Sequence, residues 1–181
     1  MRTDTATRFI PASAEALYRA FVDGEKLMAW LPPEGMSGRI LQFEPWQGGR
    51  YRIELTLEGE GHRVAGKTTE RTDIASGRFI ELVPGQRIVQ TGEFDSADPA
   101  FAGTMVMTWS FDPESGGTRV TVAATDVPSG ISAEDHEAGL ASSLANLGRF
   151  AEGPTTADQG VAASGSAVGA SGSSSLAPGT T

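Results

Sequence analysis

Apolar residues recur at every second position over much of residues 38–125, which is the spacing of strands that bury one face of a sheet. Residues 51–57 follow this pattern, and residues 105–111 repeat it with methionine, tryptophan and phenylalanine. Glycine pairs such as Gly48-Gly49 and Gly116-Gly117 separate the apolar segments and are typical of turns. We therefore expect a meander of antiparallel strands, about seven in all.

Two short helices are predicted near the amino terminus, after a first strand at residues 7–10. Ser13 is a helix-capping residue, and apolar residues follow it at helical spacing. A second short helix is predicted at residues 25–30, and it ends before Pro32 because proline cannot continue a helix.

A longer helix is predicted near the other end of the chain. Ser132 caps its start, and His136, Leu140, Leu144 and Leu147 lie on one stripe. The economical way to bury this stripe is an α+β fold in which a curved antiparallel sheet wraps around the helix. The space between them would be a cavity, although periodicity leaves open whether side chains fill it.

One domain is expected over residues 1–150, followed by a disordered tail at residues 151–181. About 150 patterned residues are enough for one sizeable core. In the last 31 residues, 25 are Ala, Gly, Ser, Thr or Pro, and none is aromatic. Such a segment cannot bury enough apolar surface to offset the entropy of ordering it.

Charge and composition narrow the function classes. A net charge of −9 repels phosphate backbones and anionic lipid, so neither nucleic acid nor membrane is an expected partner. The chain has no cysteine, and its two histidines, His62 and His136, lie far apart in sequence, so no metal site is expected. Neither a phosphate loop nor a dinucleotide fingerprint is present, so no cofactor is expected. A cytoplasmic location is expected, since no secretory leader is recognised.

Five sequence stretches occur in a characteristic order between residues 12 and 150. They are AEALYRAFVDGEKLMAW at 14–30, EPWQGGRYR at 44–52, GRFIELVPGQRIVQT at 77–91, TWSFDPESGGTRVTV at 108–122, and HEAGL at 136–140. Together they resemble the family of heat-shock-protein-90 ATPase-activator homologues, within the START-like (SRPBCC) superfamily. The resemblance implies a helix-grip fold with an internal cavity.

Glu81 and His136 are the candidate catalytic residues and are also candidates for ligand binding. Alternation places Glu81 on the face of Phe79, and Glu81 matches a glutamate that recurs in the family. A carboxylate facing an apolar cavity would have a raised pKa and could act as a base or an anchor. His136 could bind a ligand or carry a proton. Two local alternatives stay open: a bulge near Pro84 could turn Glu81 to solvent or toward Arg87, and His136 could be hydrogen-bonded locally.

Other candidate ligand-binding residues are large, adaptable apolar groups that line pockets in many proteins and could equally be core. They are Trp30, Tyr51, Met105, Met107, Trp109 and Leu140. Leu140 stands where members of the family often have tryptophan, and this difference would reshape a pocket.

Three functions stay open. The first, which we prefer because no catalytic constellation is recognised, is non-enzymatic binding of an apolar or aromatic small molecule in the cavity. The second is a cyclase, dehydratase or hydrolase type of enzyme in which Glu81 and His136 act as acid and base. The third is a partner-binding stress or co-chaperone regulator. The family name suggests a chaperone partner, but the amino-terminal domain of the eukaryotic co-chaperones has no counterpart in this sequence.

Overall fold

The computed structural model describes residues 2–59, 68–69 and 71–153. Within these residues, seven strands form one antiparallel sheet in the order β1-β7-β6-β5-β4-β3-β2, as the alternating pattern predicted. The strands are β1 (Thr3–Ile10), β2 (Met36–Phe43), β3 (Arg50–Leu57), β4 (Thr72–Val83), β5 (Arg87–Phe94), β6 (Met105–Glu114) and β7 (Gly117–Thr125).

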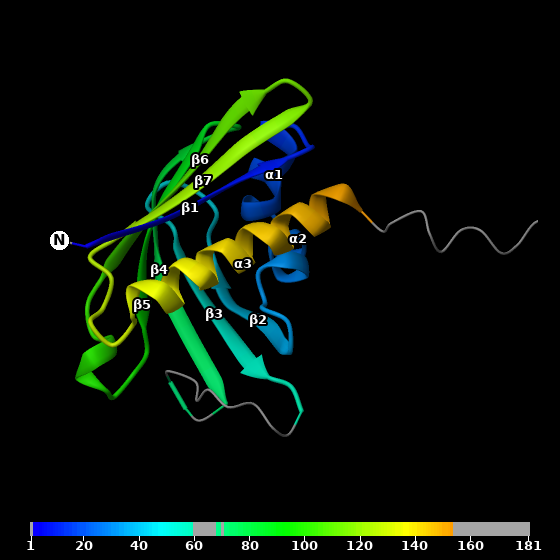
Figure 1. Ribbon diagram of the computed structural model, residues 1–181. Coiled ribbons are helices and arrows are strands. Elements are labelled where there is room, and N and C mark those ends of the chain that lie inside the picture. Colours follow the sequence, from blue (N-terminus) through cyan, green and yellow to red (C-terminus); the bar gives the residue numbers. More distant parts are fainter. Residues whose placement is uncertain (1, 60–67, 70, 154–181) are drawn as a thin grey trace, which may run out of the picture.

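The sheet is strongly curved, and its concave side faces the helices (Figure 1). Strands β2 to β7 follow one another as a meander, and β1 completes the sheet by pairing with β7. Register shifts between Ile40 and Gln42 in β2 and between Phe79 and Glu81 in β4 interrupt the ladders. Such bulges bend a strand and increase its twist, and therefore contribute to the curvature.

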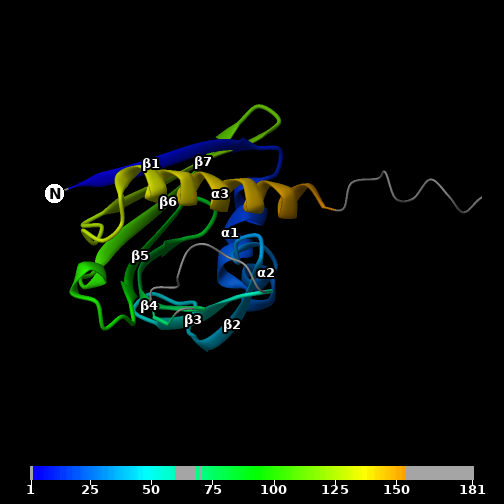
Figure 2. The same cartoon turned by 60° about the horizontal axis from the view of Figure 1, so that its bottom comes forward.

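Helices α1 (Ala14–Val22) and α2 (Gly24–Trp30) lie together at one end of the sheet (Figure 2). The predicted cap of α1 is present, because the Ser13 hydroxyl accepts a hydrogen bond from the Ala16 amide at 3.2 Å. Asp23 separates the two helices and accepts hydrogen bonds from the first amides of α2. A short 3-10 helix, Pro99–Phe101, precedes β6.

Helix α3 (Ala133–Glu152) crosses the concave side of the sheet (Figures 1 and 2). The Ser132 hydroxyl caps its start, as predicted, by accepting from the Asp135 amide at 3.1 Å. The helix includes two residues beyond the expected end of the domain, and Gly153 follows it with a φ of 73° that favours glycine. The rest of the predicted tail lies outside the described residues.

The core lies between α3, the two short helices and the inner face of the sheet. Leu140, Leu144 and Leu147 of α3 are buried, which confirms the predicted stripe. Helix α3 lies closest to β1 and also approaches α2 and α1. None of the described helices combines the length and the apolar character needed to span a bilayer.

Candidate functional site

An internal pocket of about 170 Å³ lies between the inner face of the sheet, α2 and α3. Nine of its sixteen lining residues are buried, so most of the wall belongs to the protein core. The lining residues are Phe21, Leu27, Trp30, Leu31, Phe43, Tyr51, Ile53, Leu55, Ala75, Phe79, Gln90, Gly92, Met105, Met107, Trp109 and Ser143. No charged side chain is among them.

Small residues leave the space that forms the pocket. Ala75 of β4 and Gly92 of β5 contribute little volume to the inner face, and α3 presents Ser143 at this level. A Cβ atom added at Gly92 would lie 3.1 Å from the methyl carbon of Met105 and 3.5 Å from the Tyr51 hydroxyl. Larger side chains at these positions would therefore occupy the pocket.

Four aromatic rings form a connected cluster, and three of them, Phe21, Trp30 and Trp109, line the pocket. Phe21 lies between the two indoles, with ring centroids 4.8 Å from Trp30 and 4.9 Å from Trp109. Phe21 also meets Phe111 edge to face at 5.5 Å. Tilted and edge-to-face contacts of this kind stabilise aromatic pairs beyond the burial of their area, so they hold these rings together.

Most polar atoms around the pocket already have partners. The Trp30 indole N–H donates to the carbonyl of Ala20 at 2.9 Å, and the Tyr51 hydroxyl donates to the carbonyl of Thr91 at 2.5 Å. Burial raises the pKa of Tyr51, and the negative charge of Glu93 adds to the effect, so the phenol stays neutral. The pocket is therefore uncharged as well as apolar.

Trp109 differs from Trp30 and Tyr51 in the hydrogen bonding of its polar atom. Its side chain is 3% exposed, yet its indole nitrogen has no hydrogen-bond partner among the described residues. Buried donors are nearly always paired, so this atom needs an explanation.

Five of the residues that the sequence identified as candidates line the pocket together: Trp30, Tyr51, Met105, Met107 and Trp109. Alternation along β3 and β6 puts four of them on the inner face, and Trp30 closes the wall from the end of α2. The alternation therefore predicted that the four strand residues share a face, although it could not predict the empty volume in front of that face.

Glu81 does not face the pocket as a candidate ligand-binding residue would, and the structure instead agrees with the alternative left open by the sequence, a bulge that turns Glu81 toward Arg87. The register of β4 and β5 shifts between Phe79 and Glu81, so the bulge reverses the alternation at this point. Phe79 pairs with Gln90 on the inner face, whereas Glu81 pairs with Val89 on the outer face. The Glu81 carboxylate lies 2.7 Å from the Arg87 guanidinium, and these hydrogen bonds lower the pKa of Glu81 where the sequence had suggested a raised one.

His136 and Leu140 are also absent from the pocket lining. The His136 Nδ1 atom lies 2.8 Å from the carboxylate of Asp4, which is buried at the edge strand β1. Leu140 is buried in the core. Glu81 and His136 thus belong to two separate polar pairs, and the acid–base pair considered from the sequence is not assembled.

Sequence reasoning missed several lining residues. Ile53 and Leu55 share the inner face with Tyr51, so the alternation already contained the signal for them. Gln90 and Ser143 have no such signal, because a polar residue on a strand or helix is usually solvated.

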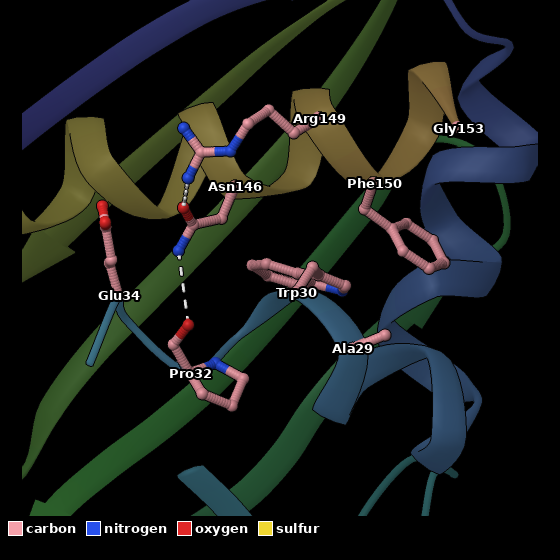
Figure 3. Close-up of a pocket in the computed structure, with 8 residues that line it drawn as sticks. All are labelled: Ala29, Trp30, Pro32, Glu34, Asn146, Arg149, Phe150 and Gly153. Carbon is pink, nitrogen blue, oxygen red and sulfur yellow. Dashed lines mark hydrogen bonds between the residues drawn. The ribbon is translucent and has the colours of Figure 1, made fainter. Parts of the chain in front are cut away.

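A second hollow, the α3 groove, lies on the surface between α2 and the carboxyl-terminal half of α3 (Figure 3). Its volume is about 730 Å³, but it is wide open to solvent. Asn146 accepts a hydrogen bond from Arg149 and donates to the carbonyl of Pro32 at 3.5 Å (Figure 3). Trp30 lines both hollows and so forms a wall between them.

The α3 groove is a poorer apolar site than the internal pocket, because an apolar ligand in an open groove stays largely in contact with water. The groove is lined by Ala29, Trp30, Pro32, Glu34, Asn146, Arg149, Phe150 and Gly153.

Within the described ranges, no cluster of three or more His, Asp or Glu side chains could hold a metal ion. The second histidine, His62, lies outside these ranges.

The curved sheet, the long carboxyl-terminal helix and the pocket between them define a START-like, helix-grip domain. Residues 11–152 match the family described as Activator of Hsp90 ATPase homolog 1-like protein, and the chain belongs to this family. No curated protein matches the chain.

Solved structures agree with this assignment. A crystal structure of a protein from Chromobacterium violaceum is 32% identical, with a TM-score of 0.74, and the match covers 84% of this chain and 98% of the other. The solution structure of an AHSA1-like protein from Aeromonas hydrophila is 18% identical, with a TM-score of 0.62 and coverages of 83% and 92%. A protein from Rhodobacter sphaeroides is 24% identical, with a TM-score of 0.65 and coverages of 81% and 89%. The last two comparisons support the fold alone.

Proposed function

We propose that the protein binds a small, uncharged apolar or aromatic molecule in the internal pocket. The observation that carries this proposal is the lining itself, in which aromatic, aliphatic and methionine side chains surround the space without any charge. Transfer of apolar surface from water into such a site is favourable, and a charged ligand would lose its hydration without gaining a partner.

The volume of the pocket limits the size of the ligand. A well-studied engineered cavity of about 150 Å³, also lined by apolar side chains, binds benzene. The internal pocket has about 170 Å³ and therefore suits a molecule with one aromatic ring or a short aliphatic chain. Met105 and Met107 add adaptability, because an unbranched thioether side chain adjusts its shape to different ligands.

Thermal unfolding in the presence of benzene tests the proposal. A ligand that binds only the folded state stabilises it by about 2.7 kcal/mol when its free concentration is 100 times Kd. We expect benzene to raise the melting temperature of the wild-type protein in a saturable manner. An unchanged melting temperature up to the solubility limit of benzene would contradict the proposal.

Two matched variants make the test specific. Ala75 lies on the inner face opposite Ile53 and lines the pocket, so Ala75→Leu should fill it and abolish the response to benzene. Ala123 lies on the outer face of β7, between the buried residues Val122 and Ala124. Ala123→Leu should leave the response intact. Equal responses in the two variants would place benzene elsewhere.

Neither of the other two functions has a specific observation in its favour. The enzyme alternative required Glu81 and His136 to share one space, and their side chains bind Arg87 and Asp4 respectively. The suggestion of a chaperone partner rests on the family description alone.

A further inference from the structure

Gln90 is a polar residue in the middle of the apolar inner face. It lies on β5, the central strand of the sheet, and its register partners are Phe79 on β4 and Met107 on β6. Both partners line the internal pocket, and so does Gln90. An apolar side chain would be buried more favourably at such a position, so a glutamine there departs from the local pattern. Departures of this kind are expected at functional sites.

The neighbours of Gln90 leave its side chain facing the pocket. Residues two positions away on a strand share its face, and these are Ile88 and Gly92. Ile88 is fully buried, whereas Gly92 lines the pocket and has no side chain. The side chains of Ile88, Phe79 and Met107 therefore flank Gln90 on three sides, and the space over Gly92 belongs to the pocket.

The Gln90 amide is both unpartnered and accessible. None of the hydrogen bonds among the described residues uses this side chain. In the same part of the chain, the fully buried side-chain atoms without a partner belong to Arg2 and Trp109, and the Gln90 amide is not among them. The Trp109 nitrogen is therefore sealed by packing, whereas the Gln90 amide can be reached by a molecule in the pocket. A few polar groups on an apolar lining commonly orient a ligand.

The other polar side chains on the lining favour a ligand that donates a hydrogen bond. The Tyr51 hydroxyl gives its proton to the carbonyl of Thr91, and the Ser143 hydroxyl gives its proton to the carbonyl of Gly139. Both hydroxyl oxygens remain as acceptors. Gln90 adds one acceptor oxygen and one NH2 donor group. Acceptors therefore outnumber donors on this lining, and a ligand hydroxyl, which donates and accepts, suits it.

We propose that the ligand is a neutral, ring-sized molecule with a hydroxyl group that hydrogen-bonds with the Gln90 side-chain amide, as a phenol would. The inference rests on the proposed function, because it names a ligand class for the same pocket. The apolar walls bind the ring, and the amide distinguishes a phenol from a hydrocarbon of the same shape. An ionised phenolate or carboxylate would find no positive charge on the lining.

Toluene and phenol are matched probes, because a methyl group and a hydroxyl group on a benzene ring are similar in size. Phenol is neutral at neutral pH, since a phenolic hydroxyl ionises only at about pH 10. We expect both probes to bind the wild-type protein in calorimetric titrations. The informative quantity is the ratio of the toluene Kd to the phenol Kd. Gln90→Met keeps the length of the side chain and removes the amide, and loss of one neutral hydrogen bond should lower this ratio by about threefold to tenfold.

Two control variants separate the Gln90 amide from the shape of the pocket. Met107→Leu changes the apolar lining residue opposite Gln90, so both affinities should change together and their ratio should stay within about twofold of the wild-type value. Gln86→Met removes an exposed glutamine from the turn before β5 and should change neither affinity. A ratio that falls as much in Met107→Leu as in Gln90→Met would overturn the assignment to Gln90.

An NMR measurement on the wild-type protein covers the case in which Gln90→Met does not fold. We expect phenol to move the side-chain NH2 resonances of Gln90 downfield, as a new hydrogen bond does, toluene to leave them without that shift, and the NH2 resonances of Gln86 to respond to neither. If neither toluene nor phenol binds, the proposed function itself fails. If both bind but Gln90→Met keeps the wild-type ratio, or the Gln90 resonances respond equally to the two probes, the pocket binds ligands and the hydroxyl chemistry assigned to Gln90 is wrong.

Discussion

Trp30 and Trp109 meet nearly edge to face, with ring centroids 6.2 Å apart and an angle of 78° between their planes. One indole N–H is bonded to a backbone carbonyl, and the other is buried without a partner among the described residues. Both rings line the internal pocket, so the two indoles belong to one wall.

Leu144 tests the packing of α3 against the core. Its side chain is 1% exposed, and replacing a buried leucine with alanine removes apolar contacts and leaves a cavity. We expect Leu144→Ala to lower the free energy of unfolding by about 2 to 5 kcal/mol in a urea titration. Ser142→Ala, at an exposed position of the same helix, should change it by no more than about 0.5 kcal/mol. Wild-type stability in Leu144→Ala would mean that α3 packs differently.

The buried Asp4–His136 pair predicts a dependence of stability on pH. Burial raises the pKa of Asp4, but hydrogen bonds with His136 and Arg2 outweigh it, so the pKa lies below the ordinary value of 3.8. An aspartate with a lowered pKa stabilises the folded state above the ordinary pKa. This contribution is lost as the pH falls through the pKa of the folded state, because the unfolded chain then binds more protons.

Asp4→Asn should therefore lower the free energy of unfolding at neutral pH by about 1 to 3 kcal/mol, since it leaves the partly buried donors of His136 and Arg2 poorly paired. The variant should also lose less stability than the wild type as the pH falls below about 4. Asp112→Asn, at an exposed position, is the matched control. If the free energy of unfolding depended on pH in the same way in the wild type and in Asp4→Asn, the account of this pair would be contradicted.

Replacement of Glu81 should have no effect on ligand binding. Its carboxylate lies on the outer face of the sheet and pairs with Arg87. We expect Glu81→Gln to bind benzene with a Kd within about twofold of the wild-type value, since a solvated ion pair far from a site changes little. Calorimetric titration gives the comparison, with Ala75→Leu as the variant that loses binding. A large loss of benzene affinity in Glu81→Gln would show that Glu81 contributes to the binding site.

The sequence contained most of the fold but only part of the site. Periodicity predicted the meander and the inward stripe of α3, and the residue types of Ser13 and Ser132 predicted the caps of α1 and α3, because these features depend on local sequence and on burial of one face. The first strand was predicted from residue 7 and begins at Thr3. Asp4 was therefore not considered, although it shares an inward side with Ile10.

The positions of Glu81 and His136 outside the pocket have a physical origin. Alternation holds only where the register is unbroken, and the sequence suggested a bulge near Pro84 as an alternative but did not fix its position between Phe79 and Glu81. The partner of His136 lies 132 residues away, and local spacing has no information about such a contact. Similarly, the pocket depends on how small residues of β4, β5 and α3 are brought together.

Methyl NMR of protein labelled with 13C at the methionine methyl groups tests the central claim most directly. Met105 and Met107 line the internal pocket, whereas Met28 and Met36 do not. On titration with benzene, we predict saturable shifts of the Met105 and Met107 methyl resonances, much smaller shifts at Met28 and Met36, and loss of the response in Ala75→Leu. Shifts that are absent, that do not saturate, or that are equal at these four of the five methionines would contradict binding in the internal pocket.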